Sequence, residues 1–175
     1  MTMVRKATAS DIDAIERIYD AIHSYEETGK CVIGWRRGVY PTRATANDAL
    51  NNGDLYVLEH DGVIRGAAII NKIQLPEYAL GQWKVQAADE DILVLHTLVV
   101  DPNHPNHGHG TELVDFYISM GRKLGCKVLR IDTQARNARA RRFYPRFGFS
   151  EVGIVSADFF GGHDTVDLVL LEKSL

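Results

Sequence analysis

The chain has 175 residues, of which 45% are hydrophobic and 25% charged, and this indicates one globular domain over residues 1–175 with enough apolar material for a core. Its net charge of −3 disfavours nucleic acid as a partner, and no apolar stretch reaches the ~20 residues of a membrane-spanning helix. The amino terminus lacks the apolar segment of a signal peptide, and the two cysteines form no disulfide framework or metal-like spacing. The composition therefore predicts a cytoplasmic protein without a membrane partner.

Two helices are predicted in the first third of the chain. The first covers residues 11–27, with Ser10 as its amino-terminal cap, and one face carries an apolar stripe of Ile12, Ile15, Tyr19 and Ile22. The second covers residues 44–50 and stops at an Asn-Asn-Gly sequence. The segment 28–40 between them indicates an irregular loop.

The middle of the chain predicts strands. Residues 55–59 and 63–70 flank a His-Asp-Gly sequence that is typical of a hairpin. Residues 75–90 contain proline, glycine and few apolar side chains, so we expect a loop there. The most apolar strand follows at residues 92–100.

The last third alternates between helix and strand. A glycine loop opens a helix over residues 111–124, and a strand at 128–132 and a short helix at 137–147 come next. Residues 151–155 and 165–171 resemble a closing pair of strands. This order favours a mixed sheet with helices on both of its faces.

The glycine loop carries the sharpest chemical signal in the sequence. Gly108 and Gly110 stand where a helix opens, and the backbone N–H groups of residues 107–111 are free to meet a ligand. Because a helix amino terminus favours negative charge, this arrangement is typical of a pyrophosphate site. Thr111 and Leu113 exclude the Walker and dinucleotide motifs, respectively, and a plain turn is the alternative.

Two segments of the chain carry longer motifs. The first is Leu98-x-Val100-x-Pro102 followed by Gly108-x-Gly110, and the second runs over residues 137–149. The first resembles the acetyl-CoA-binding motif of the GNAT superfamily of N-acetyltransferases, and the second resembles that family's Asn-x-x-Ala-x-x-x-Tyr-x-x-x-Gly-Phe segment. The first motif departs from the family at Pro105, where Arg or Gln is usual, and a proline has no N–H to offer a phosphate.

The resemblance implies a fold and a co-substrate. The expected fold is α/β, with a mixed, mostly antiparallel central sheet, helices on both faces and a splayed parallel pair of strands, the acyl-CoA N-acyltransferase fold. The expected co-substrate is acetyl-CoA, whose acetyl group an amine attacks directly in a ternary complex. The residues expected to contact it are Leu98, Val99, Val100, His107, Gly108, His109, Gly110, Thr111, Asn137 and Arg142.

The resemblance also assigns two catalytic roles. Tyr144 occupies the position of the family's general acid, which gives a proton to the leaving thiolate; a tyrosine at the edge of the core is the alternative. His96 precedes Leu98 by two residues on one strand face and has the reference pKa of a general base, but a buried core histidine is equally compatible with the sequence. The N–H near Leu98 is expected to polarise the thioester oxygen.

The acceptor pocket is expected after the first helix and at the final hairpin. Glu26, Trp35 and Tyr40 are predicted to meet the amine, with residues 159, 160 and 163 closing the other side. Asp132 at the end of its strand is predicted to hold the amine, although it could also orient a base or cap the following turn.

Two other patterns have ordinary explanations. The histidines at 104, 107 and 109 resemble a metal tract, but no cysteine or carboxylate joins them at zinc-finger spacing, so no metal is predicted. The arginines between residues 136 and 146 resemble a nucleic-acid patch, yet a helix would spread them over several faces.

The sequence thus predicts an N-acetyltransferase that modifies a small-molecule amine. A protein or peptide acetyltransferase is one alternative, and a non-catalytic acyl-CoA sensor is another. The resemblance also implies a homodimer. The catalytic pair favours an enzyme, because a sensor needs neither proton donor nor base.

Overall fold

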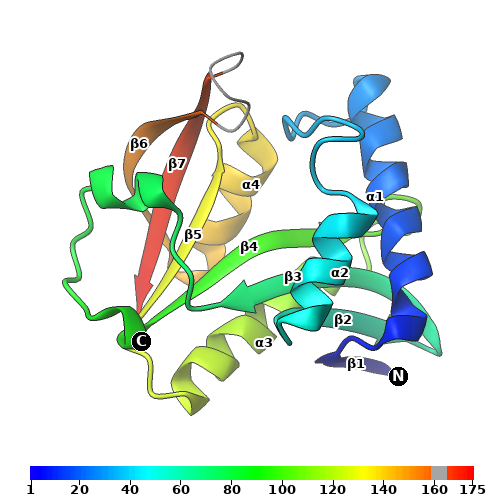
Figure 1. Ribbon diagram of the computed structural model, residues 1–175, viewed down its shortest axis with the longest axis horizontal. Helices are drawn as coiled ribbons and strands as arrows, with labels where there is room; N and C mark the ends of the chain where they lie inside the picture. Colours follow the sequence, from blue (N-terminus) through cyan, green and yellow to red (C-terminus); the bar gives the residue numbers. More distant parts are fainter. Residues whose placement is uncertain (159–164) are drawn as a thin grey trace. The chain divides into compact units, whose positions relative to one another are not determined.

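The computed structural model describes residues 1–158 and 165–175, and the chain within them divides into two compact units (Figure 1). The first unit comprises Met1–Ile70 and His96–Tyr117, and the second comprises Asn71–Leu95 and Ile118–Leu175. Strand β4 (Ile92–Val100) belongs to both, because its first four residues lie in the second unit and the rest in the first. In the described part of the chain, no helix is both long and apolar enough to cross a membrane.

The first unit is built from β1, β2, all of β3 but its last residue, the end of β4 and helices. Its elements in chain order are β1 (Thr2–Lys6), a 3-10 turn η1 (Ala9–Asp11), α1 (Ile12–Glu27), α2 (Arg43–Asn51), β2 (Leu55–His60), β3 (Val63–Asn71) and the first turns of α3 (His109–Lys123). Strands β1, β2 and β3 pair antiparallel. The predicted hairpin is confirmed, since Asp61 and Gly62 both have positive φ angles, of 50° and 79°, as a two-residue turn requires.

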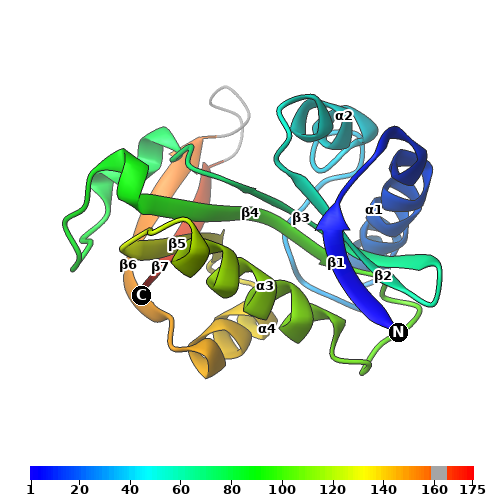
Figure 2. The same ribbon diagram turned by 90° about the horizontal axis from the view of Figure 1, so that it is seen from below.

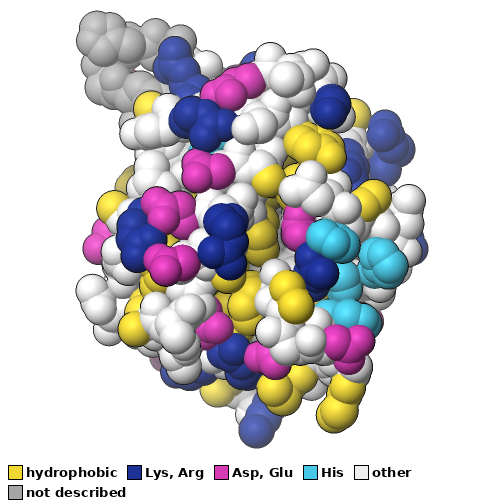
Figure 3. Space-filling model, turned by 90° about the vertical axis from the view of Figure 1, so that its right-hand side faces the viewer, with side chains coloured by type: hydrophobic (Ala, Val, Ile, Leu, Met, Phe, Trp, Pro, Cys, Tyr) yellow, Lys and Arg dark blue, Asp and Glu magenta, His cyan; other side chains and the backbone are white. Residues whose placement is uncertain are grey.

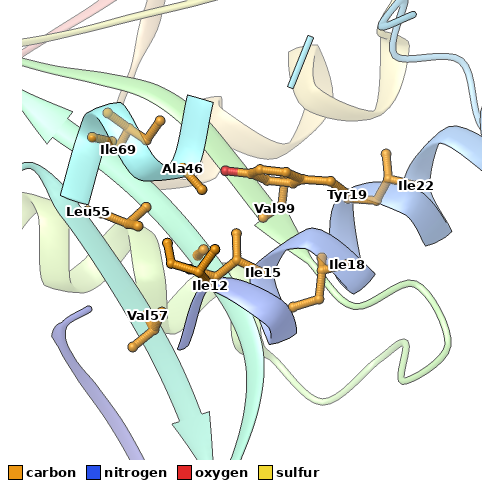
Figure 4. Close-up of a cluster of buried hydrophobic side chains, with 12 residues drawn as sticks. Ile12, Ile15, Ile18, Tyr19, Ile22, Ala46, Leu55, Val57, Ile69 and Val99 are labelled. Carbon is orange, nitrogen blue, oxygen red and sulfur yellow. The ribbon is translucent and has the colours of Figure 1, made fainter. Parts of the chain in front are cut away.

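Helices cover both faces of the strands in the first unit. Leu55 and Val57 of β2 pack in one cluster with the apolar stripe of α1, as predicted (Figure 4). Tyr56 points to the other face, where its ring lies 5.3 Å from that of Phe116 in α3. Figure 2 shows α3 on the side of β2 opposite to α1. The alternation of side chains along a strand is the reason that one strand serves both layers.

The second unit combines short helical segments with a second set of strands. Its elements are the 3-10 turns η2 (Pro76–Leu80) and η3 (Asp89–Asp91), the start of β4, the end of α3, β5 (Val128–Gln134), α4 (Ala138–Phe143), η4 (Tyr144–Phe147), β6 (Ser150–Asp158) and β7 (Thr165–Ser174). The apolar core here includes Tyr78 of η2 together with side chains of the strands: Ile92, Val94, Val128, Val152, Val155, Ala157, Leu168 and Leu170.

Strand pairing follows the order β1-β2-β3-β4-β5-β7-β6. Antiparallel pairs join β5 to β7 and β6 to β7, whereas β4 and β5 are parallel. The parallel ladder joins Ile92–Leu95 to residues 128–131 and ends there, although both strands continue. The mixed, mostly antiparallel sheet with one parallel pair is therefore confirmed.

Three details of the sequence prediction were wrong. Strand β1 was not predicted, because its five residues carry two adjacent charges and show no clean alternation. Ser10 is not the cap of α1: it lies within η1, whose cap is Thr8 with an N–H that donates to the Asp11 carboxylate at 2.8 Å, and Asp11 is the residue before α1. Helix α3 begins at His109 and not at Thr111, so that Gly110 lies in its first turn.

Asp11 predicts how the stability of the protein depends on pH. Arg5 donates to both of its carboxylate oxygens, at 2.8 and 2.9 Å, and this lowers the pKa of the buried Asp11 to about 2. Because the folded-state pKa lies below the ordinary value, the stabilisation is complete above about pH 4 and is lost as the pH falls towards 2. We expect Asp11→Asn to lower the free energy of unfolding by about 2 kcal/mol at neutral pH. Urea titrations should show a flatter pH dependence between pH 4 and 2, and an unchanged slope there would contradict the assignment.

Candidate active site

The end of β4 presents two distinct faces. Thr97 and Val99 are buried, at 1% and 2% exposure, whereas His96, Leu98 and Val100 between them are half-buried. Val99 packs in the cluster beneath α1, so its side chain belongs to the core. The three half-buried residues lie on the other face of the strand, where the sequence analysis placed them.

A tight turn connects β4 to the glycine loop. The Asp101 carboxylate accepts hydrogen bonds from the Asn103 N–H at 3.0 Å and from Arg65 at 3.1 Å, and the His104 ring nitrogen Nδ1 lies 2.8 Å from both Asp101 and Arg65. Burial would raise the pKa of Asp101, but these partners outweigh it and lower that pKa. The carboxylate therefore stays ionised and fixes the turn that leads into the loop.

The glycine loop brings several backbone N–H groups together at the amino terminus of α3. Asn106 and Gly108 adopt left-handed conformations, with φ of 67° and 79°, and α3 starts immediately afterwards at His109. The N–H of Glu112 is the first that bonds within the helix, to the Gly108 carbonyl at 3.1 Å. The preceding N–H groups of the first turn have no acceptor in the helix, and the helix dipole adds partial positive charge there. This is the geometry of an anion-binding site.

Histidine side chains gather beside this helix start (Figure 3). The ring of His109 lies 5.4 Å from that of His60 and 5.6 Å from that of His107, centroid to centroid. Burial lowers the pKa of His109 more than the charge of Glu112 raises it, and the neighbouring histidines and Arg65 lower it further, so the buried ring is neutral at pH 7. Among the described residues, no group of three or more His, Cys, Asp or Glu side chains is arranged to hold a metal ion.

Of the predicted acceptor residues in the first unit, Glu26 lies in the last turn of α1, and Trp35 and Tyr40 lie in the loop that follows. The Glu26 carboxylate accepts the N–H groups of Ile33 at 2.5 Å and Gly34 at 2.9 Å, so it organises that loop. Tyr40 stands edge-on to Trp35 with ring centroids 5.8 Å apart, and its hydroxyl is hydrogen-bonded to that of Thr97. The loop is thereby tied to the buried face of β4.

Tyr144 is a buried residue of the second unit. It begins η4, is 7% exposed and packs against the rings of Phe143 and Phe149 at centroid distances of 5.4 and 6.0 Å. Burial raises the pKa of its hydroxyl, and the negative charge of Asp132 raises it further. The phenol is therefore fully protonated at neutral pH.

The other predicted residues of the second unit lie close to Tyr144 in the sequence. The side-chain oxygen of Asn137 caps α4 by accepting the N–H of Ala140 at 3.1 Å, which accounts for the asparagine in that motif. Arg142 is exposed on α4, whereas Arg141 pairs with Glu151 at 2.8 Å. Residues 159, 160 and 163, which were predicted to close the pocket, lie outside the described residues.

Tyr78 is a residue of the site that the sequence did not reveal. It lies in the segment interpreted as a loop, yet it is 2% exposed and its hydroxyl donates to the Asp132 carboxylate at 2.8 Å. Burial raises the pKa of Asp132 to about 6, while the bond from Tyr78 lowers it and the charge of Glu77 raises it. The two partners are 54 positions apart, so no local pattern could have revealed the contact.

Comparisons with known proteins identify the family to which the chain belongs. The acetyltransferase (GNAT) family matches residues 14–149. An uncharacterized N-acetyltransferase of Methanocaldococcus jannaschii is 29% identical over 73 residues, which are 42% of this chain and 32% of that protein, so the match spans about a third of the curated relative's length.

Solved structures agree in fold. The ribosomal-protein-alanine N-acetyltransferase of Brucella melitensis superimposes with a TM-score of 0.71 at 21% identity, covering 99% of both chains. An N-acetyltransferase of Staphylococcus aureus Mu50 gives 0.70 at 18% identity over 99% of this chain and 98% of its own. The Salmonella typhimurium protein yncA, solved with its cofactor acetyl-CoA, gives 0.68 at 20% identity over 100% and 94%. These TM-scores establish a shared fold.

Proposed function

Because this chain belongs to the acetyltransferase (GNAT) family, we propose that it transfers the acetyl group of acetyl-CoA to the primary amine of a small molecule. The observation that carries the proposal is the start of α3. A left-handed glycine turn there is followed by N–H groups with no acceptor inside the helix. The diphosphate of coenzyme A is an anion suited to that position.

The coenzyme contacts follow from this anchor. The backbone of residues 107–111 binds the diphosphate, and the main chain around Leu98 and Val100 meets the pantetheine arm. What supports the second contact is that the ladder between β4 and β5 ends at Leu95, before these residues. Arg142, exposed on α4, is assigned to the charged end of the coenzyme.

The proposed chemistry is a direct attack of the amine on the thioester. His96 takes a proton from the attacking nitrogen, and the N–H near Leu98 polarises the thioester oxygen. The C–N bond forms, the C–S bond breaks, and the leaving thiolate takes its proton from the Tyr144 hydroxyl. What supports this role is the place of Tyr144 in the 137–149 motif, at the start of η4 directly after α4.

The acceptor is assigned to the loop after α1 and to Asp132. The edge-on pair of Trp35 and Tyr40 provides an aromatic wall, and the Tyr40 hydroxyl is held by Thr97. Glu26 supports this wall indirectly, since its carboxylate holds the backbone of the same loop. A half-buried carboxylate at Asp132 suits a cationic amine.

A protein acceptor is the second candidate. It is favoured by one structural neighbour, the Brucella melitensis enzyme, which is a ribosomal-protein-alanine N-acetyltransferase. A protein acceptor needs a groove that admits an extended chain, whereas a small amine needs only a closed pocket.

The experiment has two steps. Calorimetry with coenzyme A and acetyl-CoA should first detect binding to the purified chain. A panel of small amines and lysine- or alanine-terminated peptides, with acetyl-CoA, is then followed by release of free thiol. Release that depends on a small primary amine supports the proposal, and release with peptides alone establishes the second candidate. Binding without transfer to any acceptor would indicate a sensor, and absence of binding would overturn the proposal entirely.

A further inference from the structure

Asp132 lies at the point on β5 where the pairing with neighbouring strands changes. The parallel ladder with β4 ends at the preceding residue, Ile131, whereas the antiparallel ladder with β7 continues, with Asp132 opposite Leu170. Asp132 is thus the first residue of β5 beyond the parallel pairing. It is half-buried, so part of the residue still reaches solvent.

Tyr78 holds the Asp132 carboxylate in one place. Its hydroxyl donates to Oδ1 at 2.8 Å from η2, a short turn inserted between β3 and β4. The ring packs 5.2 Å from that of Trp83, whose indole N–H donates back to the Tyr78 carbonyl at 2.7 Å. Because Tyr78 is held at its hydroxyl, its ring and its backbone carbonyl, the hydroxyl has a fixed position as a donor.

The segment that carries Tyr78 is itself anchored to the strands. The buried Glu172 of β7 accepts the N–H of Lys84 at 2.7 Å. The guanidinium of Arg130, which precedes Asp132 by two positions on β5, lies 4.0 Å from the centre of the Trp83 ring. These contacts fix the segment 75–90, which the sequence presents as an irregular loop, and so keep the Tyr78 hydroxyl beside the Asp132 carboxylate.

The charged and titratable groups around Asp132 set its protonation. Burial raises its pKa to about 6, with the charge of Glu77 in η2 acting in the same direction and the Tyr78 bond against it. Tyr144 in η4 responds to the charge of Asp132, so the carboxylate lies within electrostatic reach of the proposed acid. At neutral pH most molecules carry an ionised Asp132 whose affinity for a proton is well above that of an ordinary aspartate.

We infer that Asp132 is a catalytic residue that takes the first proton from the acceptor's ammonium group, and that Tyr78 is the positioning residue that holds it. The inference rests on the proposed function. The ammonium gives one proton to the carboxylate, and the freed lone pair forms the C–N bond as the C–S bond breaks. The second proton of the nitrogen leaves to His96, and the thiolate is protonated by Tyr144. The substrate class is accordingly an aliphatic primary amine, which is a cation at neutral pH.

The pH profile of kcat/KM with the fastest aliphatic amine tests this. Tyr78→Phe removes only the hydroxyl that lowers the pKa of Asp132, so the acidic limb should move upward by about one pH unit, with much of the activity kept above it. Glu77→Gln removes a charge that raises the same pKa, so it should move the limb in the opposite direction. His96→Gln should lower the rate, and the opposite shifts caused by Tyr78→Phe and Glu77→Gln should persist in that background.

A purely structural role for Tyr78 gives a different result. Tyr78→Phe would then lower kcat/KM equally at every pH, and an unmoved limb in both Tyr78→Phe and Glu77→Gln would overturn the inference. Glu77 is half-buried at a turn, so we expect Glu77→Gln to fold. Its pH profile therefore tests the inference even if Tyr78→Phe folds poorly. If the wild-type chain transfers acetyl groups but the acidic limbs of the two variants do not move, only the inference is refuted. If the wild-type chain transfers no acetyl group, the proposed function is refuted as well.

A second comparison isolates the proton that Asp132 removes. Asp132→Asn should lower kcat/KM at least about 100-fold for the aliphatic amine, the size of effect expected when a positioned base is lost. A fluorinated analogue of the same amine is already neutral at the assay pH, so its loss should be only a few-fold. Equal losses with both amines would contradict a role in deprotonation.

Discussion

Replacing Tyr144 with phenylalanine should lower kcat for acetyl transfer by about 10²- to 10³-fold, because the thiolate then leaves without a positioned proton donor. The ring is buried among Phe143 and Phe149, and phenylalanine preserves that packing. Binding of acetyl-CoA, measured by calorimetry, should change by less than about three-fold, since the loss falls on the transition state.

The matched control for this variant is Tyr19→Phe. Tyr19 is also buried, at 1% exposure, and lies in the core of the first unit, where its hydroxyl has no hydrogen-bond partner among the described residues (Figure 4). The same chemical change there should leave kcat unaltered and should not lower the melting temperature, because an unsatisfied buried hydroxyl is removed. Equal kcat values for the two variants would show that Tyr144 is a packing residue.

Replacing Gly108 with valine should weaken the binding of coenzyme A by about 10- to 100-fold, the equivalent of one or two lost hydrogen bonds to the diphosphate. Gly108 has φ of 79°, a left-handed conformation that a β-branched residue adopts only with strain. The loop must then rearrange, and the N–H groups ahead of Glu112 no longer converge on one point. Calorimetry with coenzyme A measures the effect directly.

Gly125→Val provides the control at the other end of α3. Gly125 has φ of 71°, and a Cβ atom at either glycine would meet no heavy atom within 4 Å, so the backbone strain is comparable. The helix places the two positions ~22 Å apart, at 1.5 Å per residue. We expect both variants to lose similar stability and Gly108→Val alone to lose coenzyme affinity. A parallel loss in Gly125→Val would assign the effect to the helix as a whole.

Local patterns predicted most of the elements well, and the exceptions have physical causes. The apolar stripe of α1 and the alternation along β4 are properties of a few adjacent residues, so they are visible in the sequence. The start of α3 was misplaced by two residues, because a glycine inside a first turn looks the same in a sequence as a glycine before it. Strand β1 depends on pairing with β2, which supplies partners fifty or more residues away.

The candidate site likewise contains features that the sequence reveals and contacts that it does not. The order of residues alone determined the strand, glycine loop and helix, and the motif around Tyr144, because these depend on neighbours along the chain. Only the tertiary structure decided that Glu26 holds a loop, that the Tyr40 hydroxyl bonds to Thr97 and that Tyr78 donates to Asp132. Each of these contacts needs two segments to meet in space, and the energy of burial that brings them together is a property of the folded chain and not of either segment.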